Sequence, residues 1–324
     1  MVSAKAVYKR ILVTGGAGFV GSHVVDALLA DKKVERVVVV DNFDTNYDPA
    51  LKEANARIHK KDKRYNLVRA DICDRKRMRA LFKKEQFDAV LHLAAKCDAR
   101  KAVDDPEPYL HTNILGTWNL LDAAREFGVT KFVFASTSSV YGNGNKAPFV
   151  ETASTDRALT AYGASKKAAE QLAYTYHHNF GIHIACLRIF NAYGERMRPD
   201  LVLPKWVRAL QRGEAIKLSG KGTRRRDFTY VGDIANAFLL ALRAPLSFEV
   251  LNVGSSKPVA LSELLRIVEA ALATKVVVIE VPSHAGSVEM THANTKKAER
   301  MLGWKPTVTL KEGVAKYVAW LANS

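Results

Sequence analysis

The sequence predicts an α/β protein: a doubly wound parallel sheet with a smaller C-terminal α/β lobe that binds the substrate. Three observations lead to this prediction. Short β-branched and apolar runs alternate with helical patterns through residues 10–188. A glycine-rich turn follows the first of these runs directly. Beyond residue 188, prolines interrupt shorter elements and the alternation loosens, as expected of a separate lobe.

The apolar runs and the helical periodicity place the individual elements. Strands are expected at residues 10–14, 37–40, 65–70, 89–93, 131–135 and 182–188. Helices are expected at residues 22–30, 75–84, 108–127, 161–180, 203–212, 261–273, 296–302 and 310–321. Residues 231–244 are expected to return to the edge of the sheet. We therefore expect a cofactor-binding domain of residues 1–188, which residues 229–254 rejoin, and a lobe of residues 189–324.

The first turn has the pattern of a dinucleotide-binding loop in a Rossmann domain. It follows a strand, precedes a helix and contains three spaced glycines. Gly15 permits the tight turn, Gly18 lets the backbone approach a pyrophosphate, and Gly21 allows the helix to pack closely on the strand. Asp41 ends the second strand, where a carboxylate accepts hydrogen bonds from both ribose hydroxyls and repels a 2′-phosphate. The cofactor is therefore predicted to be NAD rather than NADP.

The stretch from residue 134 to residue 166 carries the residues that we expect to do the chemistry. Tyr162 and Lys166 stand one turn apart on the same face of a predicted helix. A tyrosine has an ordinary pKa of about 10, but a lysine ammonium and an oxidised nicotinamide both favour its phenolate. Thr137, at the end of a strand, is placed to share the proton of a substrate hydroxyl. The trio suits hydride removal from an alcohol carbon, and the glycine turn upstream favours this interpretation over a solvated helix face.

Composition excludes several other classes of protein. The formal net charge is +16, but the basic residues are dispersed, so we expect no binding to nucleic acid. Cys73, Cys97 and Cys186 are scattered and form no C-x-x-C pair, so they are predicted to be reduced packing residues. No histidine has metal-ligand spacing, and no metal site is expected. The chain begins without the apolar segment of a signal peptide and has no membrane-spanning stretch. We therefore expect a soluble, cytoplasmic protein with no membrane partner.

With these residues placed, the chain resembles an extended short-chain dehydrogenase/reductase of the nucleotide-sugar epimerase/dehydratase group. The segments that carry the resemblance occur in order: TGGAGFVGSH, HLAA, SSVYG, YGASK, RIFNAYG, RDFTYVGDI and LGWKP. Within this group the sequence is most similar to the UDP-glucuronate 4-epimerases. That closer similarity lies in the segments NYDPALKEA, RPD and THAN.

The resemblance implies roles for further residues. The implied cofactor contacts, beside the glycines, Asp41, Tyr162 and Lys166, are Phe19, Val20, Asn42, Asp71, Ile72, Leu93, Ala94, Ala95, Lys96 and Asn113. The implied substrate contacts are Thr137, Ser138, Ser139, Asn191, Arg198 and Arg226. Of these, the three hydroxyl residues and Arg198 would cradle a carboxylate. The resemblance also implies a homodimer in which the helices at 108–127 and 161–180 pair with their counterparts.

The implied activity is NAD-dependent 4-epimerisation of a UDP-sugar, with a 4-keto intermediate and the hydride returned from bound NADH. The expected conversion is UDP-glucuronate to UDP-galacturonate. Alternatives stay open, because Asn191 stands where this subfamily usually has threonine; asparagine is more typical of related epimerases and of the decarboxylase that makes UDP-xylose. The alternatives are a UDP-glucose/UDP-galactose 4-epimerase and a UDP-glucuronate decarboxylase. Against the decarboxylase, Ser139 stands where that enzyme has glutamate. A non-catalytic NAD-binding scaffold is a further alternative. His284 and Ser287 replace an arginine and an aspartate, so one diphosphate contact is missing from the pattern.

Overall fold

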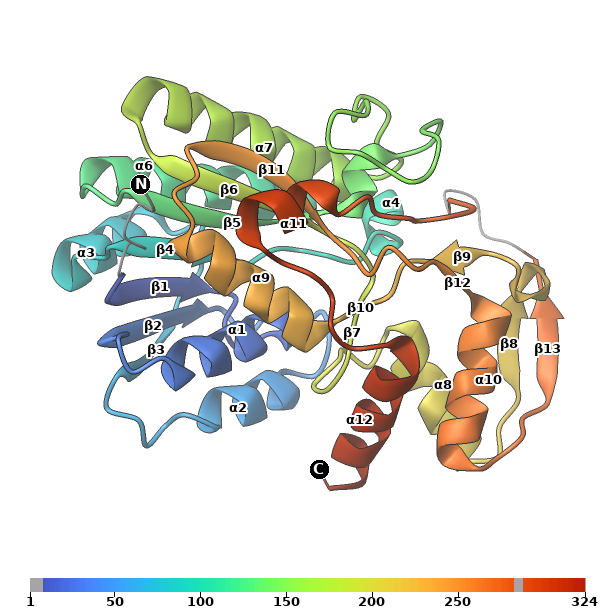
Figure 1. Cartoon of the computed structure of the whole chain (residues 1–324). Helices are drawn as coiled ribbons and strands as arrows, with labels where there is room; N and C mark the ends of the chain where they lie inside the picture. Colours follow the sequence, from blue (N-terminus) through green and yellow to red (C-terminus); the bar gives the residue numbers. More distant parts are fainter. Residues whose placement is uncertain (1–7, 283–287, 324) are drawn as a thin grey trace.

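The computed structural model describes residues 8–282 and 288–323. Figure 1 shows a central sheet between layers of helices, with a smaller lobe beside it. The sheet has seven parallel strands in the order β11-β6-β5-β4-β1-β2-β3. Their bounds are β1 (Arg10–Thr14), β2 (Arg36–Asp41), β3 (Tyr65–Arg69), β4 (Ala89–His92), β5 (Lys131–Thr137), β6 (His183–Ile189) and β11 (Phe248–Val253). The predicted fold class, a doubly wound parallel sheet, is confirmed.

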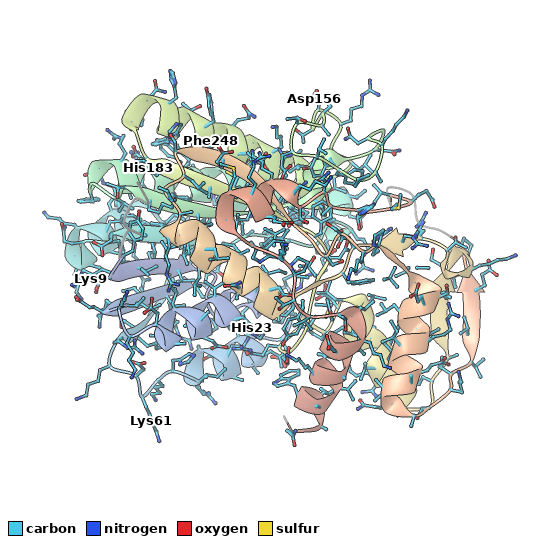
Figure 2. The ribbon with its side chains drawn as sticks, viewed as in Figure 1. Lys9, His23, Lys61, Asp156, His183 and Phe248 are labelled. Carbon is cyan, nitrogen blue, oxygen red and sulfur yellow. The ribbon has the colours of Figure 1, made fainter. Side chains whose placement is uncertain are left out.

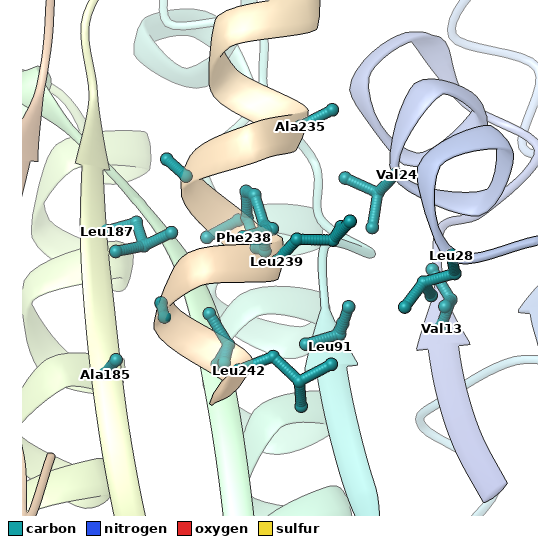
Figure 3. Close-up of a cluster of buried hydrophobic side chains, with 14 of the residues drawn as sticks. Val13, Val24, Leu28, Leu91, Ala185, Leu187, Ala235, Phe238, Leu239 and Leu242 are labelled. Carbon is teal, nitrogen blue, oxygen red and sulfur yellow. The ribbon is translucent and has the colours of Figure 1, made fainter. Parts of the chain in front are cut away.

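Helices bury both faces of the sheet, which is why the central strands read as continuous apolar runs. One face carries α1 (Phe19–Ala30), α9 (Val231–Arg243) and α11 (Lys296–Leu302). The other carries α3 (Arg75–Glu85), α6 (Thr117–Glu126) and α7 (Ala161–Phe180). In the first layer, Phe238 and Leu239 of α9 reach toward strands and toward α1 (Figure 3). Full burial of each such side chain contributes about 1.5–3 kcal/mol, so α9 is an integral part of this half.

The segment expected as one helix over residues 108–127 is helical throughout but contains one widened turn. It runs through α5 (Glu107–Leu110), the π-helical turn η1 (His111–Gly116) and α6. At the end of the wide turn, a Cβ on Gly116 would lie 2.5 Å from Cδ1 of Ile72. The backbone therefore packs directly on the segment that follows β3. The predicted helix over residues 108–127 is thus confirmed as continuously helical backbone, but apolar periodicity did not register the single widened turn within it.

The sequence predicted that residues 231–244 lie at the edge of the sheet, and this prediction was wrong. They form α9, whose apolar residues pack on a face of the sheet. The edge next to β6 is taken by β11, which pairs with it in parallel over its whole length. A helix cannot supply the hydrogen bonds of an edge, so the short strand after it does. We keep the division of the chain near residue 188 as a proposal.

The smaller lobe has its own apolar core, formed where three helices meet a two-stranded parallel sheet (Figure 1). The helices are α8 (Val202–Gln211), α10 (Leu261–Leu272) and α12 (Leu310–Ala322), and the strands are β8 (Ile216–Ser219) and β13 (Val278–Val281). The remaining elements are short: α2 (Pro49–Arg57), α4 (Lys101–Asp104), β7 (Ala192–Tyr193), β9 (Arg225–Arg226), β10 (Thr229–Tyr230), β12 (Val259–Ala260), and the 3₁₀ turns η2 (Ser138–Tyr141) and η3 (Gly220–Gly222).

Charged side chains are spread around the surface. Lys9 and Lys61 are both exposed and lie at different places on the outside of the larger part (Figure 2). None of the helices in the described part of the chain is long and apolar enough to cross a membrane.

Candidate active site

A cavity of about 390 Å³ opens at the carboxyl ends of the central strands, where parallel sheets of this kind bind their ligands. It collects most of the residues that the sequence singled out. Those that line it are Gly15, Gly18, Phe19, Val20, Gly21, Asp41, Asn42, Ile72, Leu93, Ala94, Ala95, Lys96, Thr137, Ser138, Ser139, Tyr162, Lys166, Asn191 and Arg198. Asp71, Asn113 and Arg226 are not among its lining residues. The glycine turn, the tyrosine–lysine pair and the serine cluster thus share one site.

The glycine turn has the geometry that its sequence predicts. Gly15 has φ of +70° and donates its N–H to the carbonyl oxygen of Val40 at 2.7 Å. A Cβ at Gly21 would lie 2.1 Å from the carbonyl oxygen of Gly15, so only glycine lets α1 begin this close to the turn. The amino terminus of α1, with Phe19 and Val20, borders the cavity and offers N–H groups to an anion.

We expect Gly21→Ala to lower the free energy of unfolding by about 3 kcal/mol or more, because the added methyl meets rigid backbone. Urea unfolding followed by circular dichroism would measure it. Gly18→Ala is the matched control: its Cβ would lie 3.2 Å from the nearest atom, so it should keep most of the stability and weaken NAD binding. An unchanged urea midpoint for Gly21→Ala would contradict this account of the turn.

Asp41 lies at the end of β2, and its carboxylate is held in place by the backbone. It is buried and accepts hydrogen bonds from the N–H groups of Ala17 at 3.2 Å and Phe43 at 2.9 Å. Burial raises the pKa of Asp41, while the nearby Lys52 ammonium and these N–H groups oppose that shift. Asn42 also borders the cavity and donates its side-chain N–H to Asp71 at 3.0 Å. Asp71 therefore lies one hydrogen bond behind the cavity wall rather than on it.

The loop after β4 is fastened to η1 and α7 by one asparagine. The side chain of Asn113 accepts from the N–H of Lys96 at 2.9 Å and donates to its carbonyl oxygen at 3.0 Å. It also donates to Oγ of Ser165 at 3.0 Å. Nζ of Lys96 forms an ion pair with Asp44 at 2.6 Å across the cavity wall. Asn113 thus positions the loop in this structure, and the neighbouring Thr112 borders the cavity instead.

A buried histidine that was not predicted from the sequence, His92 of β4, links β1 to α6. Nδ1 of His92 lies 2.7 Å from Oγ1 of Thr14, and Nε2 lies 2.9 Å from Oγ1 of Thr117. Thr117 donates its own proton to the carbonyl oxygen of Asn113 at 2.6 Å. Because Thr117 has no second proton to give, its Oγ1 accepts a hydrogen bond from Nε2–H of His92. Nδ1 of the neutral ring then carries no proton and accepts a hydrogen bond from Oγ1 of Thr14. Burial, reinforced by the charge of Lys166, holds the pKa of His92 well below its ordinary value, so the ring stays neutral.

The predicted catalytic trio meets between β5 and α7. Nζ of Lys166 is buried and donates to the carbonyl oxygen of Ala135 at 2.8 Å. Burial lowers the pKa of Lys166 to about 8. Burial also raises the pKa of Tyr162 well above 10, as does the adjacent Cys97, whereas a hydrogen bond with Thr137 acts in the opposite direction. Without further positive charge, the phenol therefore remains protonated at neutral pH.

The close approach of these groups depends on the glycine that follows Tyr162. A Cβ on Gly163 would lie 2.7 Å from the carbonyl oxygen of Ser139, so α7 starts in direct contact with η2. Oγ1 of Thr137 accepts from the N–H of Ser139 at 3.1 Å and lies 3.3 Å from its Oγ. The backbone contact brings the tyrosine beside the hydroxyl cluster.

Two polar residues of the second half close the other side of the cavity. Asn191 accepts a hydrogen bond from Oγ1 of Thr291 at 2.8 Å, and Thr291 belongs to the THAN segment. Arg198 is buried and reaches the cavity wall next to Cys97. Arg226 lies outside the lining and donates to the carbonyl oxygen of Val288 at 2.8 Å. His284 and Ser287 fall outside the described residues.

Other residues that line the cavity were not predicted from the sequence. They include Asp44, Asn46, Tyr47, Lys52, Cys97, Thr112, Met197, Leu201, Val202 and Phe228. Cys97, predicted to be a packing residue, is exposed at the cavity. One signal was available for some of them: Asp44 to Tyr47 and Cys97 follow strand ends that face the cavity. The described residues contain no group of His, Cys, Asp or Glu that could hold a metal ion.

The site combines a glycine turn, a buried aspartate at the position that binds a ribose, and a tyrosine one helical turn from a buried lysine. These features define a dinucleotide-dependent enzyme that transfers hydride at a carbon bearing oxygen. The NAD dependent epimerase/dehydratase family matches the chain over residues 11–254. The chain belongs to this family. The cofactor is NAD, and the tight turn at Gly15 and Gly21 and the backbone-held carboxylate of Asp41 fit it.

Individual proteins of this family are similar to the chain over nearly its whole length. A UDP-glucuronate 4-epimerase of Thermodesulfobacterium geofontis is 37% identical over 310 residues, which are 95% of each chain. The structure of UDP-glucuronic acid 4-epimerase from Bacillus cereus, in complex with UDP-glucuronic acid and NAD, has a TM-score of 0.91 at 32% identity and covers 97% of this chain and 99% of its own. UDP-glucose 4-epimerase of Thermotoga maritima, with UDP-glucose, has a TM-score of 0.89 at 30% identity and covers 97% and 99%. The structures similar to this chain thus include one that binds UDP-glucuronic acid and one that binds UDP-glucose.

Proposed function

We propose that this protein is an NAD-dependent 4-epimerase that converts UDP-glucuronate into UDP-galacturonate. The observation that carries the proposal is the place of Arg198. Its guanidinium borders the same cavity as Thr137, Ser138, Ser139 and Tyr162, where a sugar with a carboxylate needs a positive partner. The similarity to UDP-glucuronate 4-epimerases over the whole chain supports the same substrate.

In this proposal, Tyr162 is the base. Its phenolate takes the proton of the C4 hydroxyl, and Thr137 relays that proton through their shared hydrogen bond. We assign the stabilisation of this phenolate, which burial otherwise disfavours, to the ammonium of Lys166 one turn further along α7. The chemistry that NAD supplies when bound is reversible hydride transfer at C4 of the sugar. The same tyrosine returns the proton after the 4-keto sugar has turned over in the cavity.

A uronate adds a second task for the protein. The 4-keto form of a hexuronate is a β-keto acid, which loses carbon dioxide when its C5–C6 bond aligns with the carbonyl π system. A guanidinium fork can restrain the carboxylate in another orientation. We therefore assign Arg198, with the hydroxyls of Ser138 and Ser139, to this restraint.

We propose cofactor contacts for the predicted residues that line the cavity. Residues of the glycine turn, Asp41 and Ile72 would hold the adenosine diphosphate half of NAD, and Lys96 would contact the nicotinamide side. We further propose that the enzyme works as a homodimer in the cytoplasm. Exposed apolar side chains of the α5–η1 region and of α7 support a dimer, among them Leu110, Leu115, Tyr174 and Phe180.

A neutral hexose is the second candidate substrate, because Asn191 stands where the uronate enzymes usually have threonine. The deciding experiment incubates the purified protein, without added NAD, with UDP-glucuronate and separately with UDP-glucose, followed by mass spectrometry of the products. We expect UDP-galacturonate and little carbon dioxide. UDP-galactose alone would overturn the uronate assignment, and a UDP-pentose would indicate a decarboxylase. No product from either sugar, even with NAD supplied, would leave a non-catalytic scaffold or another sugar nucleotide.

A further inference from the structure

Three side chains form a buried polar network behind the catalytic trio. Glu170 of α7 accepts paired hydrogen bonds from Arg188 of β6, from Nε at 2.9 Å and from Nη2 at 2.8 Å. Oε1 of Glu170 also accepts a hydrogen bond from Oγ of Ser136 of β5 at 2.6 Å. Each of the three residues is at most 3% exposed. The network therefore joins α7 to two neighbouring strands of the sheet.

A buried ion pair at this place contributes more than stability. Removing two charges from water costs several kcal/mol per ion, and apolar side chains of the same volume often stabilise a fold equally well. The charged pair supplies direction, which apolar side chains do not. Arg188 holds both oxygens of the Glu170 carboxylate, and one of them takes the proton of Ser136. The carboxylate therefore defines one position of α7 on β5.

Two neighbouring residues of β5 hold α7 in that position. The carbonyl oxygen of Ala135 accepts a hydrogen bond from Nζ of Lys166 at 2.8 Å. The next residue, Ser136, donates to Glu170, which lies one helical turn beyond Lys166. A shift of α7 along β5 would therefore break both contacts.

The same register places the catalytic hydroxyls. Thr137 follows Ser136 on β5, and Tyr162 precedes Lys166 by one turn on α7. The hydrogen bond between Thr137 and Tyr162 is thus a third contact between these two elements. If the contact of Ser136 were lost, the phenol and the ammonium would both be held less firmly against β5.

Glu170 also acts on the catalytic lysine through its charge. Burial lowers the pKa of Lys166 to about 8, and Cys97, Cys186 and Glu170 oppose that shift. The titratable groups that face Lys166 are Tyr162 and Glu170 of α7, Cys97 after β4, Cys186 of β6 and His92 of β4. Of these groups Glu170 is the carboxylate, and its ion pair with Arg188 keeps it negative.

We propose that Glu170, locked by Arg188, is a positioning residue: by binding Ser136 it sets the register of α7 on β5 and hence the place of the catalytic trio. The assignment rests on the proposed function in one respect, the roles given to Tyr162 and Lys166. It implies that the network affects the hydride step more than substrate binding or stability.

The first test, Ser136→Ala, changes the register without changing any charge. It removes the bond from β5 to Glu170 and leaves the ion pair with Arg188 in place. We expect kcat to fall about tenfold and KM to stay within about threefold, because the reacting groups lose alignment while the sugar site is kept. Kinetics are measured with whichever of UDP-glucuronate and UDP-glucose the wild type converts.

A second readout needs no sugar. The NAD-loaded protein is titrated with the ultraviolet absorbance of tyrosinate, and the spectrum of Tyr162→Phe is subtracted to give the pKa of Tyr162. Because a nearby ammonium favours the phenolate, Ser136→Ala should raise this pKa by about one pH unit. Unchanged values of kcat and of the Tyr162 pKa would overturn the proposal. Absence of wild-type turnover with both sugars would overturn the proposed function instead, and the titration would still decide the role of Glu170.

The third test replaces both partners of the ion pair. Glu170→Met with Arg188→Met fills the space without charge, and such exchanges often preserve stability. We expect a urea midpoint close to that of the wild type and a kcat about 30-fold lower, since apolar contacts define no register. The alkaline limit of activity should move to lower pH, because Glu170 no longer supports the charge of Lys166 as the pH rises toward 8. Wild-type kcat in this double variant would overturn the proposal.

Glu85→Gln is the matched control for a buried ion pair away from the site. Glu85 is buried and pairs with Nε of Arg36 at 3.3 Å, beside the first residue of β2 and outside the cavity lining. This variant should lower the urea midpoint and leave kcat and the Tyr162 pKa unchanged. Equal losses of kcat in Glu85→Gln and Ser136→Ala would show a general packing effect and would overturn the role of Glu170.

Discussion

Replacing Tyr162 with phenylalanine is expected to lower kcat by about 10³-fold or more and to leave NAD bound. The change removes one oxygen and no packing ring, so the cavity keeps its shape. Without the phenolate, its hydrogen-bond partner Thr137 remains, and a threonine hydroxyl is far too weak a base at neutral pH to replace it. Single-turnover absorbance at 340 nm measures the hydride step, and calorimetry measures NAD affinity.

Tyr109→Phe is the matched control for this result. The Tyr109 ring lies 6.5 Å from the Tyr162 ring, and its hydroxyl donates to the carbonyl oxygen of Asp98 at 2.6 Å, away from the cavity lining. Losing that hydrogen bond should reduce stability by about 1 kcal/mol and change kcat little. Substantial turnover in Tyr162→Phe would contradict the assignment of the base, whereas equal losses in both variants would indicate a packing effect.

Replacing Arg198 with alanine is expected to reduce kcat/KM for UDP-glucuronate by about 10²-fold and to affect UDP-glucose far less. The variant removes the buried positive charge that the substrate carboxylate would pair with, and such a pair is worth about 2–5 kcal/mol when one partner is truncated. Steady-state kinetics with both sugars measures the difference directly.

Two further variants distinguish the loss of the guanidinium fork from a general loss of positive charge. Arg198→Lys keeps the charge but not the fork, so it should restore only part of the activity on the uronate. Arg100→Ala is the control for a general loss of positive charge, because Arg100 is exposed and makes only long contacts, with the backbone oxygen of Asp200 at 3.4 Å and with the carboxylate of Asp98 at 3.8 Å. Equal losses of Arg198→Ala on both sugars would move the substrate to a neutral hexose.

Much of the larger half was predictable because its signals are local. The strand, the glycine turn and the helix that follow one another from residue 10 to residue 30 are contiguous, and each element is reinforced by its neighbours. Tyr162 and Lys166 were predictable for the same reason, since their spacing on one helix places them on one face.

The contacts that could not be predicted join segments far apart in the sequence. Strands β8 and β13 pair although about 60 residues separate them, and neither run has enough periodicity to identify it. Cys97 meets Arg198 in the same way, through the fold rather than through any spacing. Asp71 and Asn113, predicted to contact the cofactor, are hydrogen-bonded to Asn42 and Lys96 and are not among the lining residues, so their contact with the cofactor stays a prediction.

The late strand at the edge of the sheet determines when this protein can finish folding. Because β11 comes from residues 248–253 and α9 precedes it directly, a nascent chain that ends near residue 188 lacks both. Such a chain would carry an unpaired β6 edge and a bare apolar face where α9 belongs, the two features that promote aggregation. The cofactor-binding half therefore completes its sheet only after residue 253, when about half of the second half has been synthesised. The two halves form one cooperative unit during biosynthesis, although each has a separate apolar core.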